Sequence, residues 1–205
     1  MSPRRLTRRE IVENCITRGL LIAATPLSSV QLYAFWQNQE PVKPTPTDVL
    51  GPFFKKGAPN QAQLRIAGDP GLPLTVTGRV VNTRGDKVPG ARMGLWHADN
   101  AGRYDLQGFR YRTELVVEAA ADYKITTIMP GHYDDRPAQH IHYMISAPGH
   151  KTLITQAYFA TDPFFEGNPD KTFRKMAKDR ELVRNVLYHE KHGASITFDI
   201  CLERA

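Results

Sequence analysis

The chain has 205 residues, of which 41% are hydrophobic and 23% charged, and its formal net charge is +6. This length suits one compact domain with a short appendage and is sufficient to bury a hydrophobic core. Half of the positive excess lies in residues 1–34, where five arginines and two glutamates give a net +3. Because the remainder is only weakly basic, the charge argues against a nucleic-acid-binding protein.

Residues 1–34 have the organisation of an export leader, with a basic start followed by the apolar run 19–24. Residues 7–12, Thr-Arg-Arg-Glu-Ile-Val, resemble a bacterial twin-arginine signal. The apolar run is shorter than the roughly 20 residues of a membrane span. We therefore expect a periplasmic or extracellular protein that engages the export machinery. No small-x-small cleavage triplet is well placed after Ser29, so an uncleaved leader acting as a tether is one alternative, and a soluble amphipathic helix is another.

Residues 35–49 are expected to form an extended, proline-rich arm, and residues 50–205 a β-sandwich domain. Short segments with strand character alternate there with glycine, proline and asparagine turns, which predicts an all-β fold, an antiparallel sandwich of the transthyretin-like Greek-key kind. A helical pattern from Pro169 to about His189, with a break near Asp179, predicts a short C-terminal helical insertion. The predicted strands are 74–81, 91–98, 114–118, 123–128, 140–146, 153–158 and 195–202.

Two histidines and two tyrosines form the most informative pattern. His140 and His142 lie two apart in a predicted strand, so their side chains point to the same face and can reach one ion. Tyr133 lies shortly before them and Tyr104 lies upstream in Gly-Arg-Tyr. Two imidazoles and two phenolates suit a hard cation such as Fe(III), which can keep a tyrosine deprotonated far below its usual pKa of about 10.

Other metal sites differ from this pattern in their spacing. A cupin would need a glutamate shortly after the histidine pair, and residues 143–149 contain none. A zinc site completed by His150, or an Fe(II) site completed by Asp134 or Asp135, stays open. Only ferric phenolate among these sites would absorb visible light.

Several ordered blocks between about residue 50 and Asp162 resemble the intradiol ring-cleavage dioxygenases, and they resemble the protocatechuate 3,4-dioxygenase type more than the catechol 1,2-dioxygenase type. The blocks that carry the resemblance are 90–91, 96–99, 102–104, 126–133, 136–137, 140–142 and 153–159.

The resemblance implies an Fe(III) enzyme whose substrates are a small aromatic diol of the catechol type and O₂. Tyr104 and His140 would be equatorial ligands, and Tyr133 and His142 would be axial. Tyr133 would leave on substrate binding and accept a proton. The ring would be cleaved between its hydroxyl-bearing carbons to give a cis,cis-muconate-type dicarboxylate.

Other residues acquire roles from the same resemblance. Arg136 would stabilise negative charge that develops on the substrate carbon. The family pattern Arg-Pro-x-His-Ile-His is one residue longer here, in residues 136–142, which puts the aim of Arg136 in question. Gln156 and Tyr158 match a Thr-Gln-x-Tyr-Phe block and would support the ligands from behind, and His97 would have a supporting or structural role.

A hypothesis from a different class is an exported transthyretin-like sandwich that binds aromatic or sugar ligands without catalysis. The four filled ligand positions favour the enzyme. Which catechol derivative it cleaves does not follow from these residues, and a homo-oligomer is an open alternative to a monomer.

Overall fold

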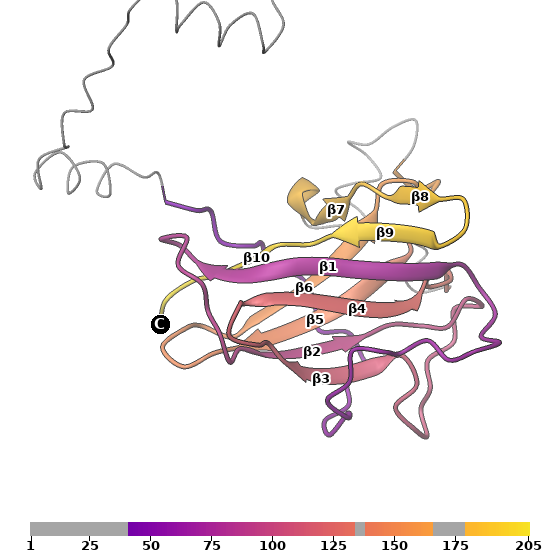
Figure 1. The fold of residues 1–205 in the computed structure, drawn as a ribbon, viewed down its shortest axis with the longest axis horizontal. Helices are drawn as coiled ribbons and strands as arrows, with labels where there is room; N and C mark the ends of the chain where they lie inside the picture. The colour runs from indigo at the N-terminus through magenta and orange to yellow at the C-terminus, as the bar shows by residue number, and fades with distance from the viewer. Residues whose placement is uncertain (1–40, 134–137, 166–178) are drawn as a thin grey trace, which may run out of the picture. The chain divides into compact units, whose positions relative to one another are not determined.

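A computed structural model describes residues 41–133, 138–165 and 179–205. The described residues form two β-sheets that enclose a hydrophobic core (Figure 1). None of the helical structure in these residues is long and apolar enough to cross a membrane. The elements in chain order are β1 (Pro73–Asn82), β2 (Arg92–Trp96), β3 (Arg112–Val116), β4 (Asp122–Ile128), β5 (His140–Ser146), β6 (Leu153–Phe159), the 3-10 turn η1 (Arg180–Leu182), β7 (Val183–Arg184), β8 (Leu187–His189), β9 (Gly193–Thr197) and β10 (Ile200–Leu202).

The all-β prediction is confirmed, with one correction to the strand directions. In the first sheet β1 pairs antiparallel with β4, but it pairs parallel with β9 and β10, which follow one another along its other edge. In the second sheet the order is β3-β2-β5-β6-β7, and β7 lies parallel to β6. Both sheets are therefore mixed, since each contains parallel and antiparallel pairs.

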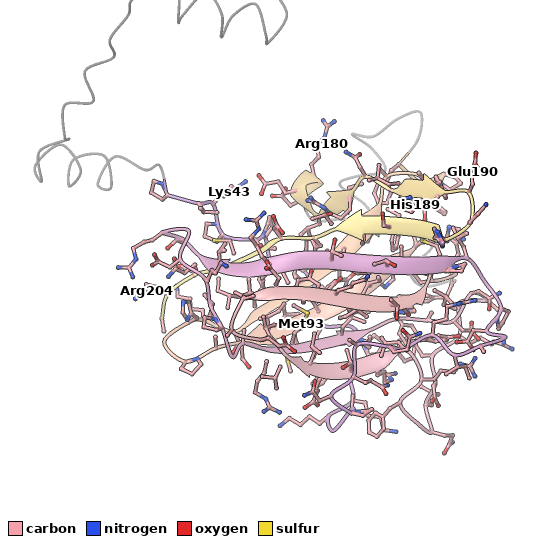
Figure 2. All side chains as sticks on the ribbon, in the orientation of Figure 1. Lys43, Met93, Arg180, His189, Glu190 and Arg204 are labelled. Atoms are coloured by element: carbon pink, nitrogen blue, oxygen red, sulfur yellow. The ribbon has the colours of Figure 1, made fainter. Side chains whose placement is uncertain are left out.

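The strand β5 shows how alternation places the core and the site on opposite faces. Ile141, Tyr143 and Ile145 are fully buried in the hydrophobic core, and the Tyr143 ring lies 5.1 Å from the ring of Phe198 beside the first sheet. Met93 of β2 lies in the same core (Figure 2). Since successive side chains of a strand point to opposite faces, His140 and His142 are directed to the outer face of the second sheet.

The predicted C-terminal helix is wrong for its described part. Residues 169–178 lie outside the described residues, but Asp179 caps the short turn η1 by accepting the Glu181 N–H, and two strands follow it. β7 pairs with β6 and β8 with β9, so the free edges of both sheets provide hydrogen-bond partners. The β-branched Val183 and Val186 also favour extended backbone at this point.

The described part of the predicted arm is extended and is hydrogen-bonded to both sheets. The Thr45 N–H donates to the Cys201 carbonyl at 3.0 Å, and the Asp48 N–H donates to the Ile154 carbonyl at 2.9 Å. Lys43 lies beside η1 (Figure 2), with its ammonium 2.6 Å from Glu181. The arm thus leads the chain from the first sheet to the second, and Gly51, just after the arm, lies against His142.

Candidate metal centre

The two histidines of β5 converge on one point. His140 is 2% exposed and His142 is 1% exposed, and their Nε2 atoms lie 3.1 Å apart. Two imidazole nitrogens bound to one ion at about 2.1 Å, at a right angle to each other, would be about 3.0 Å apart. The separation in this structure therefore fits two neighbouring positions on a single metal ion.

Neighbouring groups fix the orientation of each imidazole. The Nδ1–H of His140 donates to the Ala138 carbonyl at 2.7 Å, which leaves the lone pair on Nε2 for a metal. His142 is stacked on Trp96 of β2, with ring centroids 5.0 Å apart and an interplanar angle of 2°. A Cβ at Gly51 would lie 2.8 Å from His142 Cε1, so this position requires glycine.

The two tyrosines reach the histidines from loops. The Tyr133 hydroxyl lies 3.3 Å from His140 Nε2, and the Tyr104 ring lies 5.6 Å from the Tyr133 ring and 6.2 Å from the His142 ring. Gly102 brings the loops together, because a Cβ there would overlap the His132 carbonyl oxygen. All four ligands predicted from the sequence are therefore gathered in one place.

The chemistry of this donor set fits a ferric ion better than the alternatives. Within the described ranges no group of three or more His, Cys, Asp or Glu side chains could hold a metal ion, so the tyrosines are needed to complete a set of four. The zinc site completed by His150 is wrong, because His150 follows β5 at the end far from His140 and its Nδ1 faces the Pro148 carbonyl at 2.9 Å. Asp134 and Asp135 lie outside the described residues.

Gln156 and Tyr158 of β6 act on the segment that carries Gly51. The Gln156 amide donates to the Val49 carbonyl at 2.6 Å. The Tyr158 hydroxyl lies 3.0 Å from a carboxylate oxygen of Asp48 and 2.8 Å from the Gln156 side-chain oxygen. Tyr158 is also the strand neighbour of His140. Both residues lie on the strand beside the histidines, and Asp48 is a partner that the sequence did not indicate.

His97 is a structural residue. Its ring is stacked on Tyr111 at 5.1 Å, its Nδ1–H donates to the Ala98 carbonyl at 2.6 Å, and its Nε2 accepts the Thr127 hydroxyl at 2.7 Å. Burial lowers the pKa of His97 to about 4, so the ring is neutral at pH 7. Both ring nitrogens are engaged in the structure.

Arg112 and Phe53 also border the site. Arg112 is 3% exposed and donates to the Phe53 carbonyl at 2.6 Å, while its guanidinium lies 5.8 Å from the Tyr104 ring. Phe53 is stacked on Tyr104 at 4.2 Å. A single arginine at the start of a strand carries no sequence signal, so Arg112 was not predicted. Arg136 lies outside the described residues.

A protein-family model described as a dioxygenase matches residues 49–204. The catechol 1,2-dioxygenase of Acinetobacter baylyi is 31% identical over 149 residues, which are 58% of this chain and 48% of that protein. The hydroxyquinol 1,2-dioxygenase of Nocardioides simplex is 34% identical over 145 residues, 60% of this chain and 50% of that protein. The chain thus spans about half the length of these curated relatives.

The dioxygenase domain of a dioxygenase and carbohydrate-binding fusion protein from Streptomyces sp. SirexAA-E is similar in structure, with a TM-score of 0.70 and 34% identity. The match covers 80% of this chain and 100% of that domain. A catechol 1,2-dioxygenase from Acinetobacter sp. ADP1 shares the fold at a TM-score of 0.69 and 24% identity, over 97% of this chain and 79% of that one. With the converging histidines and tyrosines, the match over most of the domain shows that this chain belongs to the intradiol ring-cleavage dioxygenase family.

Proposed function

We propose that the protein is a non-haem Fe(III) dioxygenase that uses O₂ to cleave a catechol-type ring between its two hydroxyl-bearing carbons. The product would be a cis,cis-muconate-type dicarboxylate. The observation that carries this proposal is the convergence of three donor atoms. His140 Nε2 lies 3.1 Å from His142 Nε2 and 3.3 Å from the Tyr133 hydroxyl. The names of the relatives support the reaction, and they lend no support to a sandwich that only binds ligands.

Tyr104, Tyr133, His140 and His142 would hold the ion. When bound, Fe(III) supplies Lewis acidity, drawing electron density from both oxygens of a deprotonated catechol so that the ring becomes reactive toward O₂. Phenolate oxygens are hard, anionic ligands, which favour the ferric state over the ferrous state.

The protein's own groups would bind, orient and deprotonate the substrate. Tyr104 and Tyr133 are both partly buried on loops, and the resemblance to the family makes Tyr133 the ligand that would exchange. Its phenolate oxygen would accept the proton of one catechol hydroxyl. The stacks of Phe53 on Tyr104 and of Trp96 on His142 keep those two rings in place and exclude water from behind them.

We further propose that Arg136 stabilises negative charge on the substrate carbon, on the basis of its place in the Arg-Pro motif. We also propose export, supported by the Arg8-Arg9 pair and the apolar run of residues 19–24. Replacing Arg8 and Arg9 together by lysine should retain the protein in the cytoplasm with its leader uncut. Export at the normal level by that double variant would contradict the twin-arginine assignment.

The resemblance to the protocatechuate type and the names of the 1,2-dioxygenase relatives suggest different substrates, so the first test is a comparison. The purified protein should contain iron and absorb visible light, and its O₂ uptake should be measured with catechol, protocatechuate and hydroxyquinol. Uptake with at least one diol supports the proposal. An iron-loaded protein that consumes no O₂ with any of the three would contradict it.

A further inference from the structure

The extra residue of the Arg-Pro motif falls where the loop between two ligands returns to β5. The described ends of this loop are residues 130–133, which carry Tyr133, and residues 138–140, which carry His140. The structure shows how these two ends are held together.

Three hydrogen bonds fasten the two ends of the loop. The Gln139 backbone N–H donates to Asp162 Oδ2 at 2.7 Å, and His132 Nε2–H donates to the same oxygen at 3.0 Å. The Gln139 side-chain amide donates to the Pro130 carbonyl at 2.7 Å. One carboxylate oxygen thus binds the residue before each ligand.

Asp162 is itself held firmly. Its side chain is 0% exposed, and its other oxygen accepts the Phe164 N–H at 2.9 Å. Its own N–H donates to the carbonyl of Phe159, the last residue of β6, at 3.0 Å. A buried carboxylate needs several donors, and hydrogen bonds to a charged group are stronger than neutral ones. Asp162 therefore connects the two ends of the loop to the sheet that carries the histidines.

We propose that Asp162 is a positioning residue for the metal centre. Through His132 and Gln139 it fastens the residues beside Tyr133 and His140, which sets the Tyr133 hydroxyl 3.3 Å from His140 Nε2. This inference rests on the proposed function, since it assigns Asp162 to the same Fe(III) site. Asp162 acts through its neighbours, because its hydrogen bonds go to His132 and Gln139.

The test compares three variants with one control. Asp162→Asn keeps the shape of the side chain but replaces one acceptor oxygen by an NH₂ group, which cannot accept the donors that converge there. Gln139→Ala removes only the hydrogen bond from the Gln139 side chain to the Pro130 carbonyl. His132→Phe removes only the hydrogen bond from His132 to Asp162. Asp199→Asn is the control, because Asp199 also accepts a backbone N–H, that of Arg79 at 3.0 Å, but lies beside the first sheet.

Iron affinity should be measured by competition with a chelator, together with the position of the visible band, kcat and KM, and the unfolding of the iron-free protein. Loss of a group that orients a metal ligand typically weakens metal binding by about 10- to 100-fold. We expect that loss and a shifted band for Asp162→Asn, and smaller changes in the same direction for Gln139→Ala and His132→Phe. Asp199→Asn should match the wild type.

The possible outcomes separate this inference from the proposed function. A folded Asp162→Asn protein with wild-type affinity and spectrum would overturn the inference alone. If Asp162→Asn does not fold, the other two variants decide, and unchanged affinity and spectra in both would overturn it. A wild type that binds iron with a visible band but cleaves no diol would contradict the proposed reaction and leave the affinity comparison valid. A wild type that binds no iron would overturn both.

Discussion

Substitution of Gly51 by alanine tests the geometry around His142. Gly51 has a φ of +75°, and an added Cβ would lie 2.8 Å from His142 Cε1. Ordinary contacts begin near 3.4 Å, so either the imidazole or the Gly51 backbone must move by about 0.6 Å. The His142 ring also stacks on the parallel Trp96 ring, with 5.0 Å between the ring centroids, so a movement of the imidazole would disturb this stack.

Two costs are expected, and they can be separated. The left-handed backbone conformation costs a non-glycine residue roughly 1–2 kcal/mol. If the imidazole moves, a displacement of about 0.6 Å exceeds the tolerance of about 0.5 Å within which a site must be held. We therefore expect Gly51→Ala to lose about 10- to 100-fold in iron affinity in addition to its loss of stability.

Gly90→Ala is the matched control. Gly90 has a φ of +74°, and a Cβ there would meet nothing within 4 Å. Both variants should lose similar stability in urea unfolding of the iron-free protein. Only Gly51→Ala should lose iron to a chelator more readily. Equal iron affinity in the two variants would refute the claim that Gly51 is required by its contact with His142.

The remaining predictions concern single side chains. Tyr104→Phe should lose iron or its visible band, whereas Tyr133→Phe should keep iron and slow substrate deprotonation in stopped-flow measurements; a normal spectrum with full activity would remove either residue from the ligand set. Arg136→Leu should keep iron but lower kcat by about 10²- to 10³-fold, and a change within about threefold would show that Arg136 does not face the substrate. His97 has a folded pKa of about 4, below its usual 6.5, so the unfolded chain takes up the proton first as the pH falls. Stability should therefore decline between pH 6.5 and 4 by up to about 3 kcal/mol, and a His97→Gln variant with the same pH dependence in urea unfolding would contradict this.

The strands that frame the site were predictable because their patterns are local. β5 spans His140–Ser146 as predicted, since alternation of polar and apolar side chains is a direct consequence of a strand with one face in the core. The ligands could be chosen because His-x-His on a strand and tyrosines in glycine-rich turns are visible in the sequence.

Partners distant in the chain were not predictable. The parallel pairing of β9 and β10 with β1 depends on tertiary assembly. The strands at residues 183–184 and 187–189 do so too, because there the edges of the sheets override the helical pattern. Asp162 is another case, because a carboxylate gains its role only when His132 and Gln139 are brought to it. Such contacts leave no periodic signal.

The most direct test of the proposed reaction is the identity of the product that the iron-loaded protein forms from isotopically labelled O₂ and the diol that supports O₂ uptake, determined by mass spectrometry and NMR. We predict a cis,cis-muconate-type dicarboxylic acid, because the bond broken lies between the two hydroxyl-bearing carbons. As the product of a dioxygenase, it should contain both oxygen atoms of O₂. An aldehyde-acid from cleavage beside the hydroxyl groups, or a product without label, would contradict the proposal.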